Sequence, residues 1–276
     1  MAIKPSCNQL LTAFEASLVL NGHGHSGGAL FTGVDLGTAY TVTAVVDSEG
    51  IPVAGALTRS RASIRDGLVL DYMGSITILR EQVKMLREAG FPIRNAAAAY
   101  PPGTTGRNAK AFAHVLQGSD LEVIGLIDEP SAAAQVLGIS EGAVVDIGGG
   151  TTGISVIREG EAVYTADEAT GGIHVDLVLA GHYKIEVHEA EKIKTDPARQ
   201  SEIFPLIRPV FQKMASIVKQ HLKGHPVDTL YLVGGTSCFP GIERVMEEET
   251  GLPVARPINP LLVTPLGIAL SCVKNS

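Results

Sequence analysis

Two short segments of this chain combine an aspartate with glycine and threonine in a pattern suited to binding phosphate. The first, VDLGT, begins at Val34, and the second, VDIGGGTT, begins at Val145. Glycine lacks a β-carbon, so its N–H can approach an anion closely and it can adopt positive φ. Consecutive N–H groups in a turn form an anion-binding concavity. Asp35 and Asp146 would repel phosphate, but a carboxylate can hold hydrated Mg²⁺. The sequence therefore predicts two phosphate-binding turns with a magnesium site.

The two segments belong to a longer internal repeat. Residues 34–50 and 145–161 share the order apolar–Asp–apolar–Gly, then glycine and threonine, then alternating apolar positions and a turn. Alternation with a period of two predicts β-strands, so each copy is expected to form a β-hairpin. One such hairpin is as compatible with an ordinary turn as with a binding site. Two copies favour function and predict two similar half-molecules facing each other.

Two other nucleotide-binding motifs are excluded by the residues that follow the glycines. Gly148, Gly150 and Gly153 satisfy G-x-G-x-x-G, which in dinucleotide-binding proteins must open a helix. Here Ile154 and Val156 alternate with polar residues, which predicts a strand. No G-x-x-x-x-G-K-[ST] segment is present in the sequence, which excludes a Walker-type site.

The rest of the chain alternates predicted strands with predicted helices, which indicates a layered α/β fold. Residues 1–20 have helical spacing, and the glycine-rich residues 21–29 are expected to be a flexible linker. The apolar face of that helix either packs onto its own first lobe or docks on another protein. Residues 174–222 are predicted to be mostly helical, with Pro205 and Pro209 marking breaks or starts.

Composition narrows the class of partner and the compartment. The chain has 29 acidic and 22 basic residues and a net charge of −7, so nucleic acid and anionic membranes are not expected partners. Three scattered cysteines have neither metal-type spacing nor an even count, which is typical of a reducing compartment. No apolar run is long enough to cross a bilayer, and no secretion signal precedes the fold. We expect a cytoplasmic protein.

Five segments, in order, resemble the superfamily of actin, heat-shock chaperones and sugar kinases. They are VDLGT, VDIGGGTTG, IDEPSAAA, YLVGGTSCFPGIERVMEEETG and TPLGIAL, and they span most of the chain. The resemblance implies the actin-like ATPase fold, an α/β architecture of two similar lobes. Each lobe would hold a mixed sheet flanked by helices, with the nucleotide in the central cleft. The first lobe is then expected at 30–138, completed by 264–276, and the second at 139–263, with 1–29 as an N-terminal helix and linker.

The same resemblance assigns roles by position and implies ATP or ADP with Mg²⁺ as cofactors. Glu129 would position the attacking water, and Glu129, Asp146 and Thr151 are the candidate catalytic residues. Glu191 and Lys194 would contact the ribose, and Asp35 and Asp146 the magnesium shell. The nucleotide-binding set comprises Gly37, Thr38, Gly148, Gly149, Gly150, Thr151, Thr152, Glu191, Lys194, Gly234, Gly235 and Thr236.

Four further segments resemble the ethanolamine-utilization branch of this superfamily. They are IRDGLVLDYMGSITILR, AYPPGTTGR, ADEATGGIHVDLVLAG and EAEKIK. Members of that branch are encoded among genes for bacterial microcompartments and are regarded as chaperone-like ATPases. The resemblance implies an ATP-dependent chaperone or assembly factor whose partners are microcompartment shell or cargo enzymes. It also implies a location in the cytoplasm, in association with a microcompartment.

One departure from the chaperones predicts slow hydrolysis. They carry a catalytic lysine in the first half, whereas the stretch between Gly50 and Tyr100 has no clear counterpart, and Lys84 lies on a predicted helix. Without that cation the developing charge rests on Mg²⁺ and backbone N–H groups. Two alternatives remain open: a small-molecule kinase, which would need an aspartate base beyond the hairpin pair, and an actin-like filament protein, which the IRDG segment weakly resembles.

Overall fold

The computed structural model describes residues 3–19, 27–60, 64–65, 68–69, 71–104 and 107–274, and their strands form two five-stranded sheets and one small hairpin. The first sheet has the order β3 (Pro52–Arg59), β2 (Tyr40–Val46), β1 (Phe31–Leu36), β6 (Asn95–Tyr100) and β7 (Glu122–Asp128). The second has the order β10 (Glu161–Glu168), β9 (Thr152–Arg158), β8 (Gly142–Ile147), β11 (Leu230–Val233) and β12 (Val254–Ala255). The hairpin pairs β4 (Ile64–Arg65) with β5 (Leu68–Val69).

Both large sheets have the same topology, as the internal repeat predicts. In each, the first three strands along the chain form an antiparallel meander. The other two strands run parallel to the first of these, β1 or β8. Asp35 pairs with Val42 in the first hairpin, and Asp146 pairs with Gly153 in the second. Each aspartate therefore lies near the end of its strand, just before the turn. Because Gly153 belongs to β9, the rejection of a dinucleotide-binding helix at this point is confirmed.

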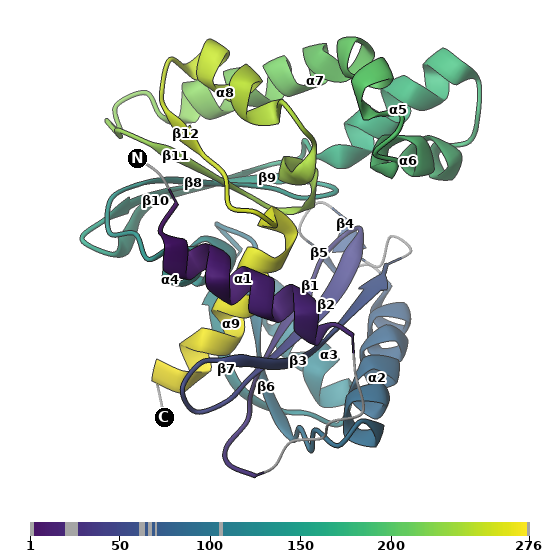
Figure 1. The fold of residues 1–276 in the computed structure, drawn as a ribbon, viewed down its shortest axis with the longest axis vertical. Coiled ribbons are helices and arrows are strands. Elements are labelled where there is room, and N and C mark those ends of the chain that lie inside the picture. Colours follow the sequence, from purple (N-terminus) through teal and green to yellow (C-terminus); the bar gives the residue numbers. More distant parts are fainter. Residues whose placement is uncertain are drawn as a thin grey trace.

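Helices cover the outer face of each sheet, giving two mixed sheets flanked by helices (Figure 1). The first sheet packs on α2 (Tyr72–Glu88) and α3 (Arg107–Gly118), and the second on α5 (Gly172–Tyr183), α7 (Gln200–His221) and α8 (Ile242–Thr250). The shorter α6 (Val187–Thr195) packs on α5, and two 3₁₀ turns, η1 (Gly235–Cys238) and η2 (Pro260–Leu262), follow β11 and β12. Each half thus has its own apolar core.

Two helices, α4 (Glu129–Leu137) and α9 (Val263–Lys274), pack against each other between the halves (Figure 1). Their backbones approach so closely that a β-carbon on Gly267 would overlap the carbonyl of Ala132. In the same way, a β-carbon on Gly33 of β1 would overlap the backbone of α9 at Ala269. Such contacts allow little sliding, since protein interiors are close-packed. The helix α9 is therefore held tightly to both α4 and β1.

The N-terminal helix α1 (Pro5–Ser17) packs on the chain itself. Cys7, Leu11 and Phe14 are buried, and α1 contacts β3, α4, α9 and η2. A β-carbon on Gly55 of β3 would lie 2.6 Å from the Phe14 ring, so this glycine makes room for the helix. The apolar residues of α1 thus pack on the chain itself, as the first of the two alternatives for residues 1–20 predicts. Most of the predicted linker, residues 21–26 of 21–29, lies outside the described residues.

One expectation about the helices is wrong. Pro205 and Pro209 lie inside α7, which runs without a break from Gln200 to His221. Proline removes a helix hydrogen bond, but the face of α7 that carries Ile203, Ile207 and Phe211 is wholly buried. Burial of an amphipathic face supplies most of the stability of helices in proteins, so packing outweighs the local preference.

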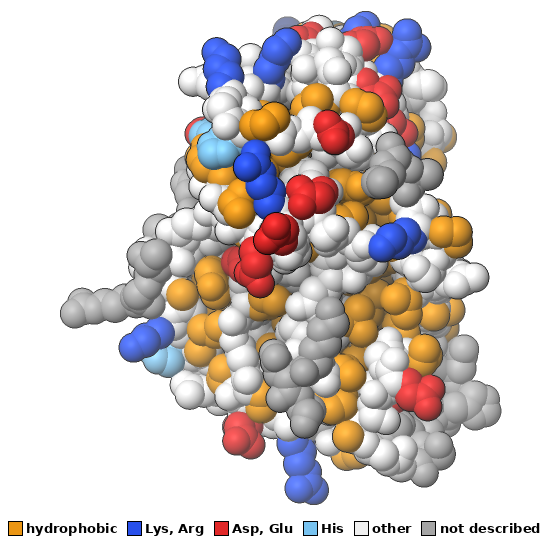
Figure 2. Space-filling model, turned by 90° about the vertical axis from the view of Figure 1, so that its left-hand side faces the viewer, with side chains coloured by type: hydrophobic (Ala, Val, Ile, Leu, Met, Phe, Trp, Pro, Cys, Tyr) orange, Lys and Arg blue, Asp and Glu red, His pale blue; other side chains and the backbone are white. Residues whose placement is uncertain are grey.

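The surface on the left-hand side of Figure 1 is mixed in character. Figure 2 shows acidic side chains gathered at mid-height, and hydrophobic side chains scattered among polar ones, chiefly over the lower half. Within the described ranges, none of the helices combines the length and the apolarity needed to span a membrane.

Candidate functional site

A cleft between the two halves gathers nearly all the predicted site residues. Its walls come from both glycine hairpins, the first residue of α4, one side of α6, the turn η1 and the start of α9. The predicted residues that line it are Asp35, Gly37, Thr38, Glu129, Asp146, Gly148, Gly149, Gly150, Thr151, Glu191, Lys194, Gly234, Gly235 and Thr236. Segments more than a hundred residues apart therefore form one site.

Each hairpin turn is closed by a single backbone hydrogen bond. The Gly37 N–H donates to the Tyr40 carbonyl at 2.9 Å, and the Gly148 N–H donates to the Thr151 carbonyl at 3.0 Å. The intervening N–H groups, at residues 38–39 and 149–151, find no backbone acceptor among the described residues. Unpaired N–H groups in successive positions form an anion-binding concavity. The cleft thus presents two such turns, one from each half.

The glycines of the second turn are needed for a reason that differs from the one expected. Gly148, Gly149 and Gly150 do not adopt positive φ. Instead, a β-carbon on Gly150 would lie 2.9 Å from the Thr38 hydroxyl, and one on Gly149 would lie 3.1 Å from the β-carbon of Ala39. The absence of side chains therefore lets the two hairpins lie against each other, which brings both sets of N–H groups to the same region.

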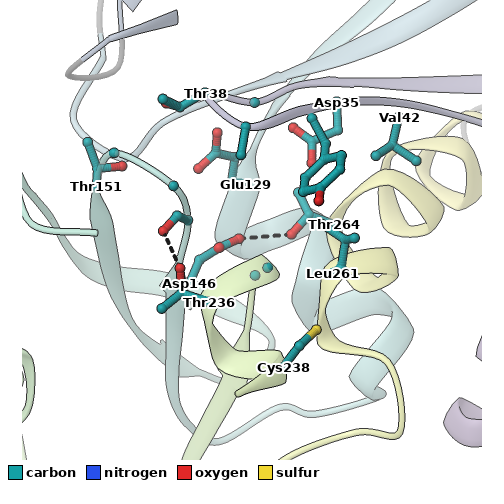
Figure 3. A pocket seen from close by; sticks show the side chains of 18 of the residues that line it. Asp35, Thr38, Val42, Glu129, Asp146, Thr151, Thr236, Cys238, Leu261 and Thr264 are labelled. Carbon is teal, nitrogen blue, oxygen red and sulfur yellow. Dashed lines mark hydrogen bonds between the residues drawn. The ribbon is translucent and has the colours of Figure 1, made fainter. Parts of the chain in front are cut away.

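Three carboxylates meet on the cleft floor (Figure 3). Burial first, and then the charge of Asp146, raise the pKa of Asp35 from 3.8 to about 7. Burial also raises the pKa of Asp146 to about 6, against a lowering contribution from a hydrogen bond with Thr264. The pKa of Glu129 is raised well above its ordinary value by burial first, and then by the charges of Asp146 and Asp35. The three acids repel one another, so a cation among them would be stabilising.

These residues fit a magnesium ion that is shared with a phosphate. Among the described residues no group of three or more His, Cys, Asp or Glu side chains is arranged to hold a metal alone. Mg²⁺ usually keeps several waters and binds through one or two carboxylates together with substrate phosphates. Asp35 and Asp146 can supply those carboxylates, and the residues of both hairpin turns line the same cleft.

Two threonine hydroxyls tie the second hairpin to neighbouring elements. Thr236 of η1 donates to the Gly148 carbonyl at 2.8 Å, and Thr264 of α9 donates to Asp146 Oδ2 at 2.9 Å (Figure 3). Sequence reasoning placed Thr236 in the site but missed Thr264, although the quoted segment TPLGIAL contains it. The only signal was a hydroxyl at the start of a helix, which is a common position for threonine.

Ion pairs surround the end of the cleft where α6 lies. The Lys194 ammonium lies 2.8 Å from both carboxylate oxygens of Asp176 and donates to the Gly172 carbonyl at 3.2 Å. Glu191 Oε1 lies 2.5 Å from Nη2 of Arg59, which belongs to β3 of the first half. Sequence reasoning missed both Arg59 and Asp176. Each of the two residues predicted to contact the ribose is thus already paired.

One predicted residue does not belong to the cleft. Thr152 is fully buried at the start of β9, and its hydroxyl donates to the Thr170 carbonyl at 2.6 Å. Successive side chains of a strand point to opposite faces. The side chain of Thr152 therefore points away from the cleft, whereas Thr151 lines it. Thr152 therefore does not line the cleft, and its nucleotide-binding role stays a prediction.

Two sheets of the same topology, joined by α4 and α9 around this cleft, define the class of protein: an actin-like ATPase. The solved structure of MreB 5 of Spiroplasma citri bound to AMPPNP superimposes with a TM-score of 0.74 over 90% of this chain and 98% of that one, at 18% sequence identity. At that identity the likeness shows the fold alone. The family described as Type IV pilus assembly protein PilM matches residues 133–264.

Within this class, the chain belongs to the family of the ethanolamine utilization protein EutJ. It is 41% identical over 267 residues to EutJ of Escherichia coli (strain K12), covering 96% of this chain and 90% of that protein. The crystal structure of EutJ from Carboxydothermus hydrogenoformans superimposes with a TM-score of 0.90 at 49% identity, covering 96% of this chain and 97% of that one. The resemblance and the fold class predicted from the sequence are thereby confirmed.

Proposed function

We propose that this chain binds ATP with Mg²⁺ in the cleft and hydrolyses it slowly. The observation that carries the proposal is the meeting of two turns of unpaired N–H groups with three mutually repelling carboxylates. The first feature suits a polyphosphate, and the second suits a divalent cation. MreB 5 of Spiroplasma citri, which shares the fold, was solved with AMPPNP and with ADP.

Each carboxylate has a separate task in this proposal. Asp35 and Asp146 would accept hydrogen bonds from waters of the magnesium shell, while the ion supplies positive charge to the phosphate oxygens. Glu129, at the first position of α4, would accept a hydrogen bond from the attacking water and orient it. Its raised pKa makes it a stronger proton acceptor than an ordinary glutamate.

Turnover should be slow because the phosphate end has no positively charged side chain in the described part of the chain. Of the described residues that line the cleft, Lys194 is the single lysine or arginine, and Asp176 already holds it. Lys84 is exposed on α2 and lies 3.8 Å from Glu88. We expect turnover below the ~1–100 s⁻¹ of kinases, which recruit such a cation.

In the cell, we propose that the bound nucleotide sets the angle between the halves. This angle would control binding to ethanolamine-utilization proteins, and the clients would be microcompartment shell or cargo enzymes. The helices α4 and α9 cross between the halves and are the natural hinge. The curated relatives of this chain bear the name ethanolamine utilization protein, which supports this choice of clients.

Isothermal calorimetry with ATP, in the presence and absence of MgCl₂, tests binding. Wild-type protein should bind ATP with a clear Mg²⁺ dependence, and Asp146→Asn should lose most of that dependence. Asp228→Asn makes the same change at an exposed position away from the cleft and serves as the control. Absence of ATP and ADP binding by the wild type at millimolar concentration would refute the proposal.

A second pair of measurements tests hydrolysis and the client. Glu129→Gln should bind ATP nearly as well as the wild type but release phosphate more slowly, because Glu129 acts on the water. The same variant, held with ATP, should co-purify with microcompartments in a different amount from wild type held with ADP. Unchanged turnover in Glu129→Gln would remove Glu129 from the mechanism, and equal co-purification would remove nucleotide control of client binding.

A further inference from the structure

The three carboxylates of the cleft lie on three different elements, and α9 contacts each of these three elements. Asp35 lies on β1, Glu129 begins α4, and Asp146 lies on β8 of the other sheet. The helix α9 packs on β1 at Gly33 and on α4 at Gly267, with backbone against backbone in both places. The glycines at these two contacts have no side chain that could adjust. The contacts therefore fix the backbone positions of β1 and α4, which carry Asp35 and Glu129, relative to α9.

The third connection is of a different kind. Asp146 belongs to the second sheet, and a side-chain hydrogen bond joins it to α9: the Thr264 hydroxyl donates to Asp146 Oδ2 at 2.9 Å. Thr264 is 3% exposed, so water competes little for this bond. The bond spans 118 positions in sequence and joins the two halves at the cleft floor.

A threonine or serine in a helix normally bonds to a carbonyl three or four residues earlier on the same helix. Other helical hydroxyls in this chain do so: Ser271 of α9 donates to the Ile268 carbonyl at 2.6 Å, and Thr77 of α2 donates to the Met73 carbonyl at 2.8 Å. Thr264 instead bonds to an acid of the opposite half. Its hydroxyl therefore serves the site rather than the helix.

We infer that Thr264 is a positioning residue that sets where the Asp146 carboxylate lies relative to Asp35 and Glu129. This inference rests on the proposed binding of ATP with Mg²⁺ and deepens it. Backbone packing holds the elements of Asp35 and Glu129 against α9. The Asp146 carboxylate itself meets α9 through this side-chain hydrogen bond, which can lengthen or break as the halves rotate. Thr264 thus couples the hinge helix to the geometry of the magnesium shell.

The test uses Thr264→Val, which keeps the shape of the side chain and removes the hydroxyl, and Thr264→Ser, which restores the hydroxyl. Calorimetry with ATP over a range of MgCl₂ gives the Mg²⁺ concentration for half-maximal enhancement of ATP binding. Partners that orient metal ligands usually change metal affinity about 10–100-fold when removed, so Thr264→Val should raise that concentration about tenfold or more. Thr264→Ser should stay within about twofold of the wild type, as a retained hydroxyl requires. ATP affinity without Mg²⁺ should be the same in all three proteins.

Ser271→Ala is the matched control, since it removes a buried hydroxyl from the same helix without touching the cleft. A shift in Thr264→Val that is below twofold, or is matched by Ser271→Ala, would overturn the inference. If the wild type binds no nucleotide, the proposed function fails, and the inference is read from crystal structures of the nucleotide-free variants. There the Asp146 carboxylate must move in Thr264→Val and keep its place in Thr264→Ser, and an unmoved carboxylate in Thr264→Val would overturn the inference.

Discussion

Arg59 on β3 and Glu191 on α6 form an ion pair across the cleft, with Nη2 of the arginine 2.5 Å from Oε1 of the glutamate. The pair joins the first half of the molecule to the second, and Glu191 lines the cleft itself. While the ion pair is formed, it would therefore restrain a ligand bound in the cleft from leaving past these two side chains.

Removing the arginine should speed the release of nucleotide. Partly exposed ion pairs contribute about 0–1 kcal/mol, so Arg59→Ala should raise the dissociation rate of a fluorescent ATP analogue by up to about fivefold in stopped-flow measurements. Arg208→Ala breaks a comparably exposed pair, with Glu248, far from the cleft and should leave the rate unchanged. Equal rates in Arg59→Ala and the wild type would show that the pair does not restrain the ligand.

Stability of the nucleotide-free protein should fall as pH rises from 4 to 7. Asp35 and Asp146 have pKa values of about 7 and about 6 in the folded state, against an ordinary 3.8. The folded protein therefore binds more protons than the unfolded chain in this interval, and the free energy of unfolding decreases with pH. The share of the loss due to these two acids is complete above the folded pKa of Asp35, and Glu129, whose pKa is also raised, adds to the decrease.

Urea unfolding at pH 5 and pH 8, without nucleotide or Mg²⁺, measures this dependence. Asp35→Asn removes the acid with the higher of these two pKa values and one source of repulsion, so the stability difference between the two pH values should shrink. Asp228→Asn is the control at an exposed position and should keep the wild-type difference. A wild-type difference retained in Asp35→Asn would contradict the raised pKa of this acid.

Gly234 should tolerate alanine less well than Gly160 does. Both adopt left-handed backbone, with φ of 87° and 82°, and that conformation costs an alanine about 1–2 kcal/mol. At Gly160 a β-carbon would meet nothing within 4 Å, whereas at Gly234 it would overlap Asp146 Oδ1. Gly234→Ala should therefore lower the free energy of unfolding by about 3 kcal/mol or more and weaken Mg²⁺-dependent ATP binding. Equal losses of stability in the two variants would show that Asp146 moves aside freely.

The N-terminal helix should contribute strongly to stability. Phe14 is fully buried between α1 and β3, and truncating a buried phenylalanine costs about 3–5 kcal/mol. Phe14→Ala should lower the free energy of unfolding by this amount in urea titrations, while Gln9→Ala, on the exposed side of the same helix, should change it by less than about 0.5 kcal/mol. A stable Phe14→Ala variant would restore the possibility that α1 leaves the fold to bind a partner.

Local sequence patterns predicted the two glycine hairpins, their aspartates and the repeat, because strand periodicity and turn chemistry act over a few residues. Local patterns misjudged α7, where burial of one face outweighed two prolines. They also included Thr152 with Thr151, since the side of a strand on which a residue lies at a turn depends on the register of the sheet.

The sequence by itself determined which groups can bind phosphate and magnesium, since that depends on the types of residue and their order within short segments. Only the tertiary structure decided how those groups are held. Thr264 meets Asp146 across 118 positions, and Arg59 meets Glu191 across the two halves. The second hairpin needs its glycines because the first lies against it. Contacts of this kind arise from the packing of whole elements, and no local period or propensity encodes them.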